Sequence, residues 1–177
     1  MKIADEYCLR PQARLAEAIP SRGNPLDVFE RISIAEHYEF ERNSKDEIHI
    51  TLPGLWCHHD LILSWDAKTE AISLFLAFDG RAPGGRTDDM CRLISLINER
   101  LTHGHFDFWN QSNALVYRHS HSLRGGAKLL IEQAQDMISQ ALDAAERGYP
   151  ASQYVIWAGK SPEDALTSAL VDLAANP

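Results

Sequence analysis

Cysteine is scarce in this chain, and long apolar runs are absent. The 177 residues contain three cysteines, Cys8, Cys57 and Cys91, which stand far apart and form no C-x-x-C pair. Such a set predicts neither a disulfide framework nor a cysteine zinc site. No segment has the roughly 18 consecutive apolar residues of a transmembrane helix, and the first residues lack the apolar stretch of a secretory signal. We therefore expect a cytoplasmic protein with reduced thiols and no membrane contact.

The common catalytic and cofactor-binding motifs are also missing. The patterns G-x-S-x-G, H-E-x-x-H and G-x-G-x-x-G do not occur. Gly159, Lys160 and Ser161 match the end of a phosphate-binding loop, but Tyr154 stands where that loop requires glycine. We expect no enzyme activity and no cofactor.

Net positive charge is lacking as well. The formal charge is -8, and the most basic segment is residues 81–128. An acidic chain repels nucleic acid, and no helix-turn-helix or basic aromatic stripe is present. We therefore exclude nucleic acid as the expected partner.

The hydrophobic pattern predicts a single α+β domain. With 45% hydrophobic residues, the chain has enough apolar material for one core. The breaker cluster that ends at Gly23 separates an N-terminal extension, residues 1–23, from a domain over residues 24–177. A short helix is expected at residues 12–18 of the extension.

The order of the elements follows from apolar periodicity and from capping residues. Alternating residues predict an antiparallel sheet of about five strands, with helices packed against it. The expected strands are residues 48–52, 56–65, 72–78, 106–109 and 115–123, and the expected helices are 24–37, 87–101, 128–147 and 161–173. Gly148 and Pro150 are expected to end the long third helix, with a separate short segment at residues 154–157.

Four histidines lie close together in the sequence. His119 and His121 are spaced to point to one face of a strand, and His103 and His105 precede them. Such imidazoles can bind a metal, as a zinc site or as part of a metal-dependent enzyme. A buried or half-buried, hydrogen-bonded surface is the alternative, and the missing carboxylate or cysteine at matching spacing makes the metal signal weak.

A basic turn follows these histidines. Arg124, Gly125 and Gly126 are expected just before the long helix, with Lys128 in its first turn. Backbone amides and cations at a helix start can hold a small anion or an acidic protein segment. Alternatively, the two glycines only allow a tight reversal between strand and helix.

Cys57 and the aromatic residues have simpler interpretations. Cys57 stands beside two histidines, but strand alternation places Cys57 and His59 on the face of Leu61 and Leu63, which favours a buried, inert thiol. Several aromatic residues are expected mainly in the core, with a partner groove as the alternative. They are Phe106, Phe108, Trp109, Tyr149, Tyr154 and Trp157.

Several segments together resemble the YbjN-like family, whose members are described as bacterial sensory transduction regulators. The similar segments are Asn24-Pro25-Leu26-Asp27, LPGLWCHHDLILSW (52–65), LINERLTHGHFDFW (96–109), YRHSHSLRGG (117–126) and YPASQYVIWAGKSPEDAL (149–166). The resemblance implies an α+β fold like that of the type III secretion chaperones. It implies no catalytic residues.

The sequence and the resemblance lead to one main hypothesis. We expect a non-enzymatic, cytosolic regulatory or chaperone-like module that binds another protein and self-associates as a homodimer. Metal binding by the histidines and small-anion sensing by residues 124–128 stay open as alternatives. The identity of the protein partner does not follow from the sequence.

Overall fold

The computed structural model describes residues 23–78, 85–109, 111–112 and 114–175. The short helix expected at residues 12–18 lies outside these ranges. The elements, in chain order, are α1 (Leu26–Glu36), β1 (Glu39–Ser44), β2 (Glu47–Pro53), β3 (His58–Asp66), β4 (Ala71–Ala77), α2 (Thr87–Asn98), β5 (His105–Trp109), β6 (Ala114–Ser122), α3 (Ile131–Ile156) and α4 (Pro162–Ala175). The predicted α+β class is confirmed.

The strands form one antiparallel sheet in the order β1-β2-β3-β4-β6-β5. In β2, β3 and β4 the buried residues alternate with partly or fully exposed ones, as expected for a sheet with one covered face. The covered face carries rows such as Ile50, Leu61 and Leu76, which are all at most 1% exposed. The other face is called the open face below.

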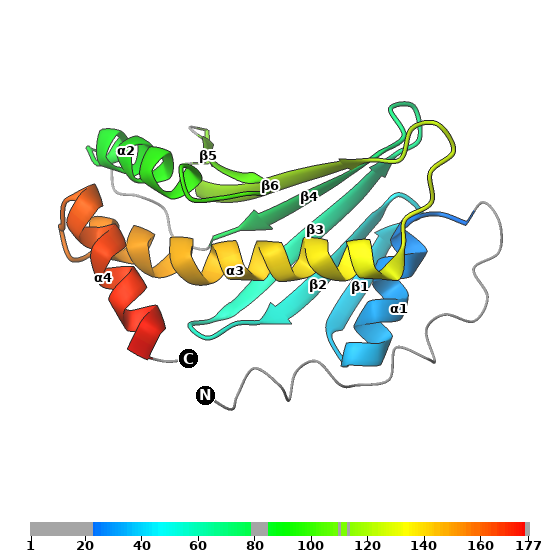
Figure 1. The fold of residues 1–177 in the computed structure, drawn as a ribbon, viewed down its shortest axis with the longest axis horizontal. Coiled ribbons are helices and arrows are strands. Elements are labelled where there is room, and N and C mark those ends of the chain that lie inside the picture. Colours follow the sequence, from blue (N-terminus) through cyan, green and yellow to red (C-terminus); the bar gives the residue numbers. More distant parts are fainter. Residues whose placement is uncertain (1–22, 79–84, 110, 113, 176–177) are drawn as a thin grey trace.

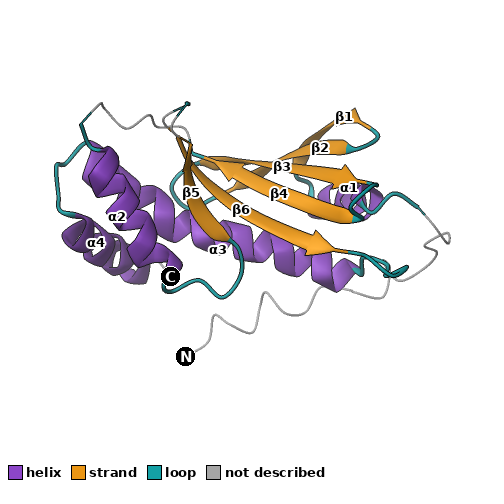
Figure 2. Ribbon diagram, turned by 90° about the horizontal axis from the view of Figure 1, so that it is seen from above, coloured by secondary structure: helices purple, strands orange, loops and turns teal. Residues whose placement is uncertain are grey.

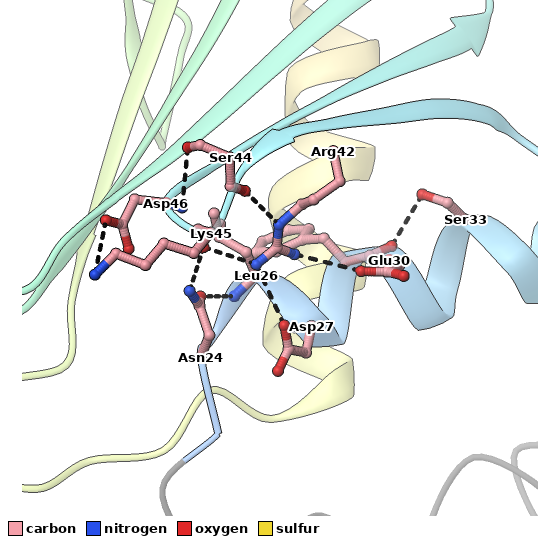
Figure 3. A network of polar contacts seen from close by, with 10 residues as sticks. Asn24, Leu26, Asp27, Glu30, Ser33, Arg42, Ser44, Lys45 and Asp46 are labelled. Carbon is pink, nitrogen blue, oxygen red and sulfur yellow. Dashed lines mark hydrogen bonds and ion pairs between the residues drawn. The ribbon is translucent and has the colours of Figure 1, made fainter.

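The sheet has six strands rather than about five, because β1 was not predicted. Its sequence, EFERNS, contains only one apolar residue, so no hydrophobic alternation marks it. Pairing with β2 and contacts with α1 hold this edge strand in place. Arg42 of β1 forms ion pairs with Asp27 and Glu30 of α1, at 3.3 and 3.5 Å (Figure 3). Charged side chains of this kind are typical of edge strands.

Helix α3 runs along the covered face of the sheet (Figures 1 and 2). Buried residues of α1, α2 and α4 join the same hydrophobic core, so all four helices pack on this side. No described element covers the open face. Among the described residues, no helix is both long and apolar enough to cross a membrane.

The predicted start and end of the third helix are both wrong. α3 starts at Ile131 rather than Lys128, and it continues through Gly148 and Pro150 to Ile156. A Cβ atom at position 148 would lie 2.5 Å from Cζ of Phe106, so glycine here serves the close packing of α3 on β5. The expected separate segment at residues 154–157 is largely part of this helix.

Pro150 is tolerated because a side chain replaces the missing backbone donor. Proline has no N–H to donate to the carbonyl four residues earlier, which is that of Glu146. The indole Nε1 of Trp56 donates to this oxygen instead, at 3.1 Å. The helix thereby keeps a satisfied carbonyl at the point where it would otherwise break.

Candidate functional site

An aromatic and cationic patch lies on the open face of the sheet. It consists of Ile62, Phe75, Trp109 and Arg118, and is called the open-face patch below. Strand pairing places Ile62 beside Phe75, and Phe75 beside Arg118. The ring centroids of Phe75 and Trp109 are 6.1 Å apart, and the guanidinium carbon of Arg118 lies 5.5 Å from the Phe75 centroid. These four residues therefore form one continuous surface across β3, β4, β6 and β5.

The patch remains accessible although its residues are apolar or aromatic. Trp109 is 42% exposed, and Phe75 and Ile62 are half-buried. Arg118 is held in position by Asp107, with Nη1 and Oδ2 3.1 Å apart and both side chains about two-fifths exposed. The patch is thus a prearranged apolar surface with the Phe75 ring at its centre and a cation, Arg118, beside it.

Carboxylates surround this patch on the same face. Strand register places six acidic residues there, and apart from His49, His58 and His105 the only basic residue in these rows is Arg118. The six are Glu39, Glu41, Glu47, Asp60, Asp66 and Asp107. The open face of the described sheet is therefore apolar around β4 and β5 and acidic toward β1.

The four predicted histidines do not converge on one point. His119 lies on the covered face of β6, and its ring stacks on that of His103 with centroids 6.0 Å apart. His105 pairs with Arg118, which puts it on the open face, away from His119. Within the described parts of the chain, no group of three or more histidine, cysteine or acidic side chains is arranged to hold a metal.

His119 has an environment that favours its neutral form. Burial lowers its pKa, and the nearby His103 and His121 lower it further. Its Nδ1 atom is buried without a hydrogen-bond partner among the described residues. The half-buried position of His119 matches the alternative that the sequence left open, and metal binding by the four histidines stays a prediction.

The basic turn is exposed and lies apart from the helix start. Gly125 and Gly126 have φ of 80° and 79°, a left-handed conformation that glycine adopts readily. Lys128 precedes α3, so its predicted place in the first turn is wrong. At the helix start itself, the N–H of Leu130 is already bound by the Oε1 of Gln133 at 3.0 Å. Anion or partner binding by Arg124, Gly125, Gly126 and Lys128 stays a prediction.

The comparisons with known proteins decide the family. A sequence pattern described as "YbjN: Putative bacterial sensory transduction regulator" matches residues 25–153, which is well over half of the chain. The chain belongs to the YbjN family. The predicted family is therefore confirmed. No curated protein matches the chain.

Solved structures with a similar fold include this family and complexes of other proteins. A chain of the ExsC-ExsE complex has a TM-score of 0.50 at 14% identity, covering 68% of this YbjN-family chain and 86% of that chain. YbjN from E. coli, described as a transcription regulator, has a TM-score of 0.49 at 14% identity, with 72% and 88% covered. The HopA1-SchA chaperone-effector complex gives 0.48 at 14% identity, with 70% and 94% covered.

A second candidate surface of this YbjN-family chain is a cleft between α2, α3 and α4. Its volume is about 220 Å³, and it is lined by Ile97, Arg100, Leu101, Arg147, Leu166 and Leu170. The four aliphatic side chains and two guanidinium groups suit an apolar segment that carries a carboxylate.

Sequence reasoning assigned the aromatic residues only in part. Phe106 is buried in the core as expected, whereas Trp109 and Trp157 are exposed, the latter by 71%. Phe75 was not singled out. The sequence does contain a sign of this exposed position. In β4, Phe75 alternates with the buried residues and shares the open face with Ser73 and Ala77.

Proposed function

We propose that this YbjN-family chain is a non-enzymatic, cytosolic regulatory or chaperone-like module that binds another polypeptide on the open face of its sheet. The observation that carries the proposal is the open-face patch, in which the half-buried ring of Phe75 lies beside both the exposed Trp109 and the guanidinium of Arg118. Aromatic side chains and arginine are the residues most enriched at the centres of protein interfaces.

The charge of the open face indicates what the partner carries. Carboxylates lie on the β1 side of the patch, so a partner with aliphatic or aromatic side chains next to lysines or arginines complements it. An acidic partner would meet repulsion from Glu41 and Asp60. We therefore propose a basic, apolar polypeptide segment as the occupant.

The similar fold in the ExsC-ExsE complex supports a partner-binding role, since that structure holds two different proteins. It does so only by analogy of fold. Self-association as a homodimer, with the second copy on the open face, is the competing occupant. An acidic face meeting its own copy is disfavoured by like charges.

The test compares variants of two exposed tryptophans. Tagged wild-type protein is used to capture partners from the cell that produces it, and the capture is repeated with Trp109→Ala and Trp157→Ala. We expect binding of the captured partner to weaken about tenfold or more for Trp109→Ala and to stay unchanged for Trp157→Ala. Equal losses for both variants, or a dimer that Trp109→Ala dissociates, would contradict the proposal.

A further inference from the structure

Three side chains form a line next to the turn that leads into β3. The Sγ of Cys57 lies 3.8 Å from Nδ1 of His59, within hydrogen-bonding range for sulfur. On the other side of the ring, Nε2 of His59 lies 3.6 Å from Oε1 of Glu146 in α3. Cys57, His59 and Glu146 thus follow the order thiol, imidazole and carboxylate.

The imidazole is buried and aimed at the thiol. His59 is 2% exposed and packs in edge-on contact with the rings of Phe78 and Tyr149, with centroids 5.9 and 6.1 Å away. Within the described part of the molecule, Nε2 of His59 and Oε2 of Glu146 are both buried, and neither atom has a hydrogen-bond partner. A buried polar ring without its full set of partners needs an explanation.

The charge state of His59 suits a proton acceptor. Burial lowers its pKa, while Glu146 and Asp60 raise it and the neighbouring His58 lowers it. A neutral ring that turns its N–H toward Glu146 has a lone pair at Nδ1 for the proton of Cys57. Cys57 itself is half-buried, in contrast to the buried thiol expected from strand alternation.

The turn that carries Cys57 is fixed by the same carboxylate. Oε1 of Glu146 accepts the N–H of Leu55 at 2.7 Å, and the N–H of Gly54 donates to the carbonyl of Cys57 at 3.1 Å. A Cβ at position 54 would lie 2.5 Å from Oε1 of Glu146 and 2.6 Å from Cδ2 of His59. The turn that carries Cys57 is therefore packed tightly against His59 and Glu146.

We propose that Cys57 is a reactive thiol that is modified by peroxide, with His59 as its base and Glu146 as a positioning residue. The proton on Sγ passes to Nδ1 of His59, and the sulfur attacks one oxygen of the peroxide. The S–O bond forms as the O–O bond breaks, so sulfur is oxidised to the sulfenic acid and the peroxide is reduced. The leaving hydroxide takes the proton back from His59 and departs as water.

The chain provides its own reference thiol. Cys91 in α2 is more exposed than Cys57 and has no histidine contact among the described residues. Exposure alone therefore predicts faster reaction at Cys91. The proposal predicts the opposite order, since a thiol whose proton passes to a neighbouring base reacts faster than a thiol without such a base.

The experiment measures both thiols in the full-length protein at pH 7. In one reaction the protein is treated with iodoacetamide, and in a second with hydrogen peroxide and a sulfenic-acid probe. The rate of modification of each cysteine is followed by mass spectrometry of the peptide that contains it. We expect Cys57 to react about tenfold or more faster than Cys91 with both reagents. A rate at Cys57 equal to or below that at Cys91 would overturn the proposal.

Two variants separate reactivity from folding. Glu146→Gln keeps an oxygen for the N–H of Leu55 but removes the charge beside His59, and His59→Gln removes the base. Both are expected to lower the Cys57 rate and to move its pH profile toward that of Cys91, whose rate stays the same as a check on the fold. If Cys57 keeps its rate and pH profile in both variants, His59 and Glu146 have no part in its chemistry.

Discussion

At the scale of single residues, one indole and one carboxylate link the turn before β3 to α3. Trp56 donates to the carbonyl of Glu146, while the side chain of Glu146 accepts from Leu55 and lies beside His59. The same pair of contacts lets α3 pass Pro150 and fixes the Cys57 turn. A sequence pattern does not reveal such contacts, because their partners are about ninety residues apart.

Replacing Trp56 tests the bond that compensates for Pro150. Trp56→Phe keeps an aromatic ring but leaves the carbonyl of Glu146 without its donor. We expect the free energy of unfolding to fall by about 1–3 kcal/mol, the cost of an unsatisfied buried acceptor. Urea unfolding measures this loss, with the exposed Trp157→Phe as the control that should change nothing.

The two neutral histidines predict a dependence of stability on pH. His59 and His119 have lowered pKa values in the folded chain, chiefly through burial, whereas the unfolded value is 6.5. As the pH falls through 6.5, the unfolded chain takes up protons that the folded chain does not, so stability falls. Thermal unfolding between pH 8 and pH 5 should show this, and His119→Phe should reduce the slope. An unchanged slope in that variant would exclude His119 as a contributor.

At the scale of elements, local patterns predicted most of the fold. The alternation in β2, β3 and β4 is confirmed, and the predicted last helix is present as α4, where the Oγ of Ser161 accepts the N–H of Asp164. β1 was missed because five of its six residues are polar and its pairing is set by β2 and α1. The sequence predicts a helix end at Gly148, because the packing against Phe106 that explains this glycine is a tertiary contact.

Gly148 supplies a test at this scale. Alanine is the better helix former by about 1 kcal/mol, so local propensity predicts that Gly148→Ala stabilises the protein. Contact of the new Cβ with the Phe106 ring predicts the reverse, a loss of about 1–3 kcal/mol. Denaturant unfolding decides between them, and the loss should shrink when Phe106→Leu is present in the same chain.

At the scale of the whole molecule, four helices pack on one side of the sheet and leave the open face without a described cover (Figures 1 and 2). The missing catalytic motifs and the family resemblance together predicted a binding module rather than an enzyme. The location of the surface did not follow from the sequence, because Ile62, Phe75, Trp109 and Arg118 come together only through the register of four strands.

The most direct test of this account is site-specific photo-cross-linking on the two sides of the molecule. A photoreactive residue is placed at Ser120, which is exposed on the open face beside the patch, or at Val171, which is 63% exposed on α4. Partner binding on the open face predicts a cross-link to a different polypeptide from position 120 and none from position 171. Two results would contradict partner binding on the open face. One is cross-linking from position 171 alone, and the other is cross-linking from position 120 to a second copy of the chain alone.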